Sequence, residues 1–133
     1  MQASPTRPSP LSIPDLRTAV TGRVIAPEDP DYDAARTVFD GGVDRRPAVI
    51  VRVADAADVA HVVRVARATG LELAVRSGGH GNNGLGVSEG GIVIDLRDIR
   101  ALDIDVDGRT VWAGAGLTAV EYSTAVAAHG LAT

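Results

Sequence analysis

The sequence contains no cysteine, no lysine and no long apolar segment. Without cysteine, the chain can form neither disulfide bonds nor thiolate metal sites. Its net charge is −4, and no basic cluster is longer than Arg45-Arg46, so nucleic acid and anionic membranes are not expected partners. No segment approaches the roughly 18 apolar residues of a membrane-spanning helix. With 45% hydrophobic residues, the composition indicates a soluble globular protein.

The first ten residues, MQASPTRPSP, contain proline and serine but no apolar segment typical of a secretory signal peptide. We therefore predict a disordered tail over residues 1–11 and take a cytoplasmic location as the default. The total length of 133 residues suits one domain or part of one.

Helical signals dominate the next segment, residues 12–44, which we predict to be an N-terminal helical entry segment. Ser12 precedes an apolar start and is a candidate helix cap. A second helix is predicted from about Pro30 to Phe39, because proline suits a first turn and acidic residues gather at its N-terminal end. Gly41-Gly42 would end that helix.

A β-α-β pattern follows. Residues 48–53 are β-branched and bounded by turn-forming residues, which predicts a buried strand. Apolar residues then recur at spacings of three and four, which predicts a helix capped by Asp55 and ended by Gly70. Residues 71–76 are predicted to be the second strand.

Shorter elements fill the remainder. Residues 91–96 predict a strand, and residues 101–114 predict a hairpin with a two-residue Asp107-Gly108 turn. A final helix is expected between Thr118, as its cap, and Gly130. The order of elements indicates an α+β fold rather than continuing β-α-β alternation. Because another strand would normally cover the last helix, we expect a domain truncated at its C-terminus.

The segment LELAVRSGGHGNNGLGVSEGG, residues 71–91, carries the strongest functional signal. Closely spaced glycines after a strand let the backbone approach a ligand and let consecutive N–H groups converge on an anion, most often phosphate. A flexible surface loop would have a similar composition. The position directly after a strand, together with Arg76 and Ser77, favours binding.

Residues 79–84 also match the G-x-G-x-x-G spacing of a dinucleotide fingerprint. A true fingerprint opens a helix whose N-terminus holds the diphosphate. The glycine-rich residues 85–91 are unsuited to such a helix, so we reject a classical Rossmann site.

RSGGH, residues 76–80, resembles the diphosphate loop of FAD-linked oxidases of the vanillyl-alcohol oxidase and p-cresol methylhydroxylase (PCMH) superfamily, particularly the berberine-bridge-enzyme-like oxidoreductases. The flanking segments resemble the same family in the same order from residue 22 to residue 133. The resemblance implies a PCMH-type FAD-binding fold over residues 45–133, present as its N-terminal half, with the β-α-β unit followed by a small mixed sheet and a helix.

The resemblance also implies a cofactor and its binding residues. In such proteins the loop that matches Arg76, Ser77, Gly78, Gly79, His80 and Gly81 binds the FAD diphosphate through backbone N–H groups. The histidine that matches His80 is covalently bonded to the flavin in many members, and neutral imidazole is a competent nucleophile. The implied activity is oxidation of a small organic substrate by hydride transfer to flavin N5, with O2 as acceptor. The substrate and catalytic base belong to parts of the family's fold that these residues do not match.

Other residues receive structural interpretations. Many relatives have serine or asparagine directly after the histidine, whereas this sequence has Gly81, followed by Asn82 and Asn83. The departure affects side-chain contacts after His80 but not the backbone N–H groups that bind the diphosphate. His61 and His129 are assigned no role. Asp95 and Asp98 are interpreted as turn residues, and Trp112 as a packing residue rather than a platform for flavin. The AGAG segment, residues 113–116, resembles the family's turn near the cofactor.

Two further hypotheses stay open from the sequence. One is a non-catalytic fragment, or a split subunit that binds FAD weakly or not at all and needs a complementing C-terminal half. The other is a nucleotide-binding module without redox function, which would leave His80 unexplained. An unfinished sheet would expose an edge and apolar surface, so we also predict poor solubility or self-association.

Overall fold

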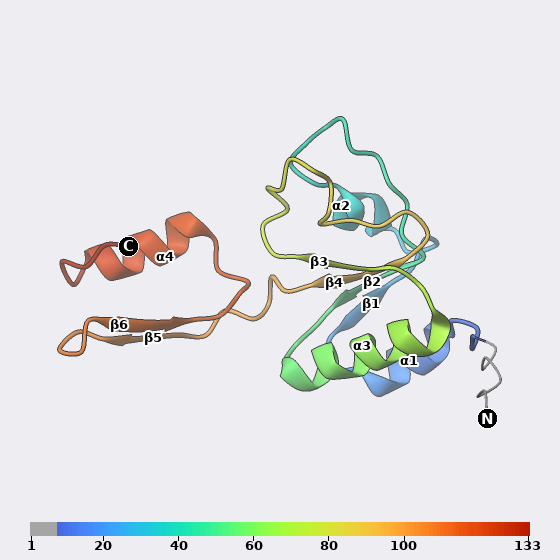
Figure 1. Cartoon of the computed structure of the whole chain (residues 1–133), viewed down its shortest axis with the longest axis horizontal. Helices are drawn as coiled ribbons and strands as arrows, with labels where there is room; N and C mark the ends of the chain where they lie inside the picture. Colours follow the sequence, from blue (N-terminus) through green and yellow to red (C-terminus); the bar gives the residue numbers. More distant parts are fainter. Residues whose placement is uncertain (1–7) are drawn as a thin grey trace, which may run out of the picture.

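The computed structural model describes residues 8–133, in which a four-stranded sheet lies between two layers and a hairpin with one helix projects from it (Figure 1). The sheet has the order β1-β2-β4-β3, formed by Arg23–Ile25, Val49–Arg52, Ile92–Asp95 and Leu73–Arg76 respectively. β1 is antiparallel to β2, whereas β2, β4 and β3 run parallel. The α+β prediction is confirmed.

Helices α1 (Ile13–Ala19) and α3 (Ala56–Thr69) cover one face of the sheet (Figure 1). Leu16 of α1 and Val62 of α3 pack in the same buried cluster as Val51 and Ile94 of the sheet. Burial of such side chains contributes about 1.5–3 kcal/mol each. This layer therefore holds much of the hydrophobic core.

The predicted ends of α3 are confirmed. The Asp55 side chain accepts a hydrogen bond from the Asp58 amide at 2.9 Å, and Gly70 takes the left-handed conformation with φ 69°. Ser12 likewise caps α1 by accepting from the Asp15 amide. Local side-chain chemistry thus sets where these helices begin and end.

The second helix is shorter than predicted, because α2 spans only Tyr32–Arg36. Pro30 precedes its N-cap, and the chain becomes extended at Thr37. Val38 is buried in the cluster on the second face of the sheet, together with Tyr32 of α2. Leaving the helix early lets Val38 reach this core, so packing overrides the local helical signal.

Residues 77–91, which we call the glycine loop, connect the adjacent parallel strands β3 and β4. A parallel connection has to return from one end of the sheet to the other and usually does so through a helix. Here the loop crosses the second face of the sheet without a helix, and its own residues Val87 and Ser88 are buried. The absence of a helix after residues 79–84 agrees with our rejection of a Rossmann site.

An arm projects from this body, formed by β5 (Leu102–Asp105), β6 (Thr110–Ala113) and α4 (Ala119–Ala127) (Figure 1). The hairpin is confirmed, but its predicted two-residue turn is wrong. Residues 106–109 form a four-residue turn, and the positive φ falls on Arg109 at 52°. The Asp105 side chain accepts from the Gly108 amide at 2.9 Å and stabilises this longer turn.

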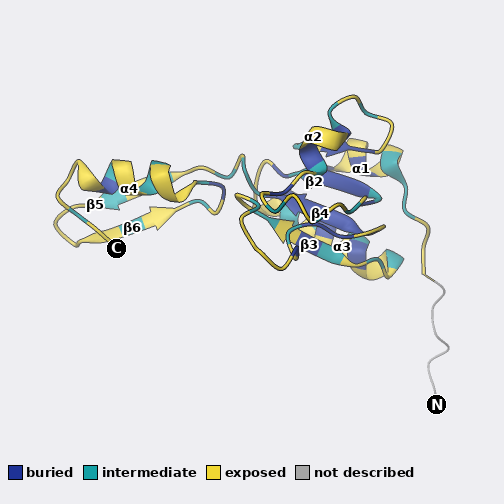
Figure 2. Ribbon diagram, turned by 90° about the horizontal axis from the view of Figure 1, so that it is seen from above, coloured by how far each residue is buried: buried dark blue, intermediate teal, exposed yellow. Residues whose placement is uncertain are grey.

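Most of the arm is exposed (Figure 2). Val126 of α4 is its only buried side chain among the described residues, whereas 82% of Trp112 is exposed. The interpretation of Trp112 as a packing residue is therefore wrong. It lies on β6 opposite Asp103 of β5, and the alternation of the strand turns it away from the buried side of the hairpin.

The N-terminal residues contact the body from residue 8 onward. The Ser9 amide donates to the Ala68 carbonyl at 2.9 Å, and Leu11 packs against the core. Residues 1–7 of the predicted tail lie outside the described residues. Across residues 8–133, none of the helices has the length and apolar character needed to cross a membrane.

Candidate functional site

The glycine loop leaves β3 at the carboxyl end of the parallel strands, where ligands of α/β sheets commonly bind. A concavity of about 320 Å³ lies at its start. Ten residues line it: Val75, Arg76, Ser77, Gly78, Gly79, His80, Gly81, Asn83, Leu85 and Gly86. The structure thus brings together all six residues predicted to bind a cofactor.

The backbone of this loop offers hydrogen-bond donors. Within residues 8–133, none of the amides from Ser77 to Asn83 donates a hydrogen bond to another protein group. Buried or ligand-facing N–H groups normally have partners. A consecutive series of free amides beside a concavity is suited to an anion with several oxygen atoms.

Two glycines keep the loop free of side chains where it turns. Gly79 has φ 74°, and a Cβ atom there would lie 3.2 Å from Nε of Arg76. A Cβ atom on Gly78 would lie 2.9 Å from Cδ2 of His80. Glycine is therefore required at Gly79 by conformation and favoured at Gly78 by space.

Arg76 places a positive charge beneath the loop. Its guanidinium donates to the Ala35 carbonyl, while its Nε is buried with no hydrogen-bond partner in the described chain. Burial lowers the pKa of Arg76, and the charge of Asp95 opposes that effect. Arginine nevertheless stays charged at physiological pH. The cation can therefore balance an anion bound by the loop.

Charged residues end all three parallel strands. Arg52 of β2 and Arg76 of β3 stand on either side of Asp95 of β4 in the strand register. Asp95 is fully buried, accepts from the Arg97 amide at 3.0 Å and pairs with the Arg97 guanidinium at 2.8 Å. The predicted turn role of Asp95 is confirmed, but its ion pairs were missed. The sequence signal that could have indicated these ion pairs is the charged residue at the end of each predicted parallel strand.

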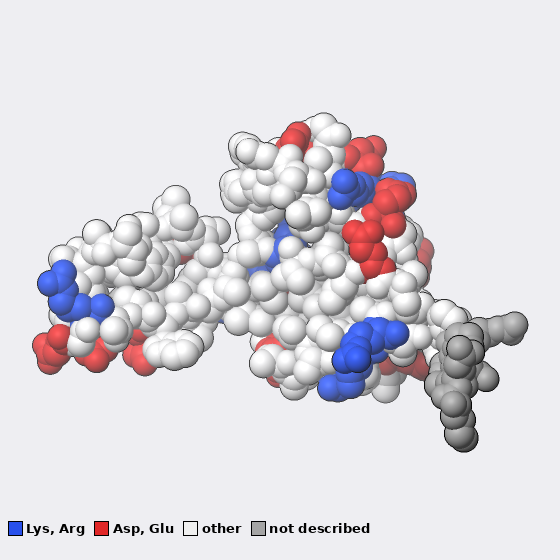
Figure 3. Space-filling view, in the orientation of Figure 1, with Lys and Arg blue, Asp and Glu red and all other residues white. Residues whose placement is uncertain are grey.

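The glycine-rich turn at residues 113–116 lies against the same loop. The Ser77 hydroxyl donates to the Ala115 carbonyl. A Cβ atom on Gly116 would lie 2.1 Å from the Leu96 carbonyl oxygen, so only glycine permits this approach. Figure 3 shows arginine atoms in the recess between the body and the arm. The base of the arm thus forms one wall beside the glycine loop.

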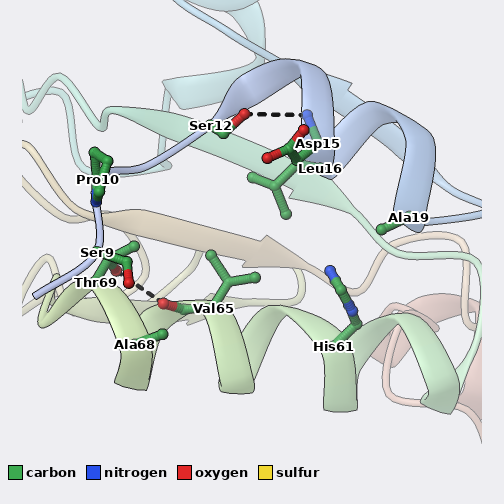
Figure 4. Close-up of a pocket in the computed structure, with 10 residues that line it drawn as sticks. All are labelled: Ser9, Pro10, Ser12, Asp15, Leu16, Ala19, His61, Val65, Ala68 and Thr69. Atoms are coloured by element: carbon green, nitrogen blue, oxygen red, sulfur yellow. Dashed lines mark hydrogen bonds between the residues drawn. The ribbon is translucent and has the colours of Figure 1, made fainter.

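The three histidines occupy different environments. His80 is exposed on the glycine loop, and its ring lies 5.0 Å from that of Phe39. His61 is half-buried beside a second cavity of about 260 Å³ between α1 and α3 (Figure 4). His129 is exposed after α4. Among the three, His80 alone lies at the candidate site.

Comparison with protein families gives a match over residues 47–133 to the family described as FAD binding domain. Two similar curated proteins are (R)-6-hydroxynicotine oxidase of Paenarthrobacter nicotinovorans and berberine bridge enzyme-like 27 of Arabidopsis thaliana. The first is 41% identical over 114 residues, which cover 86% of this chain and 25% of the oxidase. The second is 40% identical over 76 residues, which cover 55% of this chain and 14% of that protein.

Among solved structures, 6-hydroxy-D-nicotine oxidase from Arthrobacter nicotinovorans superposes with a TM-score of 0.81 and 40% identity. The match covers 84% of this chain and 24% of that structure. The chain therefore spans a quarter or less of the length of these relatives.

Proposed function

Because this chain belongs to the FAD-binding domain family of FAD-linked oxidoreductases, we propose that its glycine loop holds the diphosphate of FAD. The residues in contact would be Arg76, Ser77, Gly78, Gly79, His80 and Gly81. The observation that carries the proposal is the series of free amides beside a concavity, next to the half-buried Arg76, whose Nε is buried. These groups fit a dianionic diphosphate without an added metal ion.

Each residue has a distinct part in this binding. Gly78 and Gly79 leave room for phosphate oxygens near the backbone, where a side chain would collide. Arg76 supplies positive charge from below. Ser77 joins the loop to the turn at Ala115, so its hydroxyl fixes the loop against the arm.

His80 would form a covalent bond to the 8α-methyl carbon of the flavin. That bond replaces one methyl C–H bond with a C–N bond to an imidazole nitrogen. The methyl hydrogen and the imidazole proton leave with two electrons, which O2 accepts to form H2O2. The proposal rests on the exposed position of His80 at the mouth of the concavity and on the nucleophilicity of neutral imidazole.

Bound FAD would accept a hydride from a small organic substrate at N5 and pass the electrons to O2. Two of the similar proteins are named as oxidases, which supports this reaction class. The residues of this chain would bind and orient the cofactor. The substrate pocket and the catalytic base would be supplied by segments matching the remaining length of the relatives, in the same protein or in a complementing subunit.

The test is to express the chain with FAD available, record its visible spectrum, and then precipitate it with acid. We expect yellow protein whose colour stays in the pellet. His80→Ala should bind FAD but release it to the acid supernatant, because the backbone donors remain while the covalent bond is lost. His129→Ala, which changes an exposed histidine away from the loop, should behave as the unaltered chain does.

Other outcomes assign different functions. If acid releases the colour from the unaltered chain, the result would support an FAD site and contradict covalent attachment. A folded but colourless chain would contradict FAD binding by these residues alone and support the split-subunit alternative. Binding of adenine nucleotides without flavin would support a nucleotide-binding module.

A further inference from the structure

The glycine loop is held from outside by a preceding part of the chain. We call residues 37–46 the strap; they follow α2 and lead to β2. The Phe39 amide in the strap donates to the Gly79 carbonyl at 2.9 Å. The contact joins the strap to the residue directly before His80.

The far end of the loop is held by the same strap. The Arg45 guanidinium donates to the Gly84 carbonyl at 2.7 Å and to the Val87 carbonyl at 3.1 Å. The Arg46 amide donates to the Glu89 carboxylate at 2.8 Å. These bonds lie before and after His80 in the sequence. The strap therefore fixes the path of the whole loop around His80.

The His80 imidazole has two close neighbours. The Phe39 ring contacts it with a centroid separation of 5.0 Å and an interplanar angle of 36°. The backbone of Gly78 is also close, since a Cβ atom built there would come within 2.9 Å of Cδ2 of His80. Aromatic pairs at this separation contribute about 0.5–1.5 kcal/mol beyond burial. The pair thus favours one orientation of an otherwise exposed imidazole.

We propose that Phe39 is a positioning residue for His80, which fixes the orientation of the imidazole in which it bonds to flavin. The part of this proposal that concerns the bond to flavin rests on the proposed FAD function. The orientation of the imidazole does not, because it can be measured in the chain without cofactor. An oriented nucleophile reacts faster than a freely rotating one. Phe39 is 73% exposed, so its side chain has little part in the core and is available for this role.

The first measurement is the NMR signal of the His80 imidazole in the chain without FAD. Labelled histidine gives a signal for each of the three histidines, and the signal that is absent in His80→Ala is that of His80. We expect Phe39→Ala to move that signal toward the position of free histidine, because the ring current of Phe39 is lost. Phe39→Tyr keeps an aromatic ring and should keep the signal in place.

The second measurement is the rate at which acid-stable flavin accumulates when FAD is added to the apo chain. We expect Phe39→Ala to lower this rate about tenfold without weakening the noncovalent binding of FAD, which is measured as the flavin that acid releases. Phe39→Tyr should restore the rate. Trp112→Ala removes another exposed aromatic side chain, 82% exposed on the arm, and should change neither the rate nor the His80 signal.

Three results would overturn the proposal. They are an unchanged His80 signal in Phe39→Ala, an unchanged rate of attachment in that variant, or an equal loss of acid-stable and acid-released flavin. If the unaltered chain forms no acid-stable flavin, covalent attachment fails, and the His80 signal alone decides the role of Phe39. A signal that moves in Phe39→Ala and stays in Phe39→Tyr then supports positioning, and any other pattern contradicts it.

Discussion

Gly79 shows how one residue makes the loop able to approach an anion. Its φ of 74° lies in the left-handed region, which costs other residues about 1–2 kcal/mol. A Cβ atom would also come within 3.2 Å of the Arg76 guanidinium. We expect Gly79→Ala to lower the free energy of unfolding by about 1–2 kcal/mol and to weaken FAD binding. Urea denaturation and a flavin titration measure the two effects.

Gly41→Ala is the matched control for Gly79→Ala. Gly41 has no positive φ, and within residues 8–133 no heavy atom beyond its two chain neighbours lies within 4 Å of a Cβ atom built on it. Alanine there should be neutral or slightly stabilising, because it restricts the unfolded chain. Equal effects of the two substitutions on unfolding would show that the left-handed conformation at Gly79 is not required.

At the residue scale, the sequence predicts groups that act through their own backbone or their near neighbours. The loop at residues 76–81 and the helix caps Asp55 and Thr118 are of this kind. The loop residues line one concavity, and both caps are confirmed. Phe39 was missed as a partner of His80 because the two are far apart in sequence. The contact of Asp95 with Arg52 at 3.8 Å was missed because it depends on the order of strands, whereas the pair with Arg97 is local.

Asp58 connects two elements, since it lies in α3 and binds the segment before β1. Its carboxylate accepts from the amides of Thr21, Gly22 and Ala54 at 2.8, 2.8 and 2.9 Å, and the residue is 4% exposed. Burial by itself would raise the pKa of Asp58, but the three amides together hold it below 3.8. The charged form is therefore the one that stabilises the fold.

We expect Asp58→Asn to lower the free energy of unfolding by about 2–3 kcal/mol at neutral pH, because an amide NH2 would face backbone donors. Because the pKa of Asp58 is lower in the folded than in the unfolded chain, the carboxylate stabilises the fold at pH values above the unfolded pKa. This stabilisation is lost as the pH falls through the folded pKa. The difference between the two proteins should therefore shrink below about pH 3.8. Chemical denaturation across pH 2–7 would measure it.

Asp98→Asn controls for the loss of one negative charge, because Asp98 is exposed and makes no hydrogen bond or ion pair among residues 8–133. It should change stability by less than about 0.5 kcal/mol. A stability difference between Asp58→Asn and the unaltered chain that stays constant with pH would contradict a titrating role for Asp58.

At the element scale, the β-α-β unit and the last helix follow their sequence signals, because caps and periodicity act locally. β1 was missed because only three residues form it, and its pairing with β2 is a tertiary contact. α2 was predicted too long because Val38 packs against the sheet and draws the chain out of the helix. The hairpin turn differs because Asp105 caps a four-residue loop.

For the whole molecule, the contrast between body and arm has a consequence for association. The body contains both buried clusters, whereas the arm exposes Trp112, Val106 and Val120. Exposed apolar surface beside a two-stranded sheet favours association. We expect concentration-dependent self-association in sedimentation experiments. Trp112→Arg should weaken it about tenfold or more, since burying an aromatic side chain contributes about 1.5–3 kcal/mol.

Arginine is tolerated at residue 112 because Asp103 lies opposite on β5. Val63→Arg, at an exposed apolar residue of α3 in the body, should leave the association unchanged. A monomer with one sharp cooperative melt at all concentrations would contradict the prediction.

The strand order also governs the sequence of events during synthesis on the ribosome. β4 lies between β2 and β3 in the sheet, although it is translated after both. β2 can pair with β1 first, but neither β2 nor β3 has its parallel neighbour until residue 95 has left the exit tunnel. The parallel part of the sheet therefore cannot form strand by strand in the order of synthesis. The glycine loop connects β3 to β4, so its two ends are fixed only when β4 pairs between β2 and β3. The binding loop therefore takes its final path in the same step that completes the sheet.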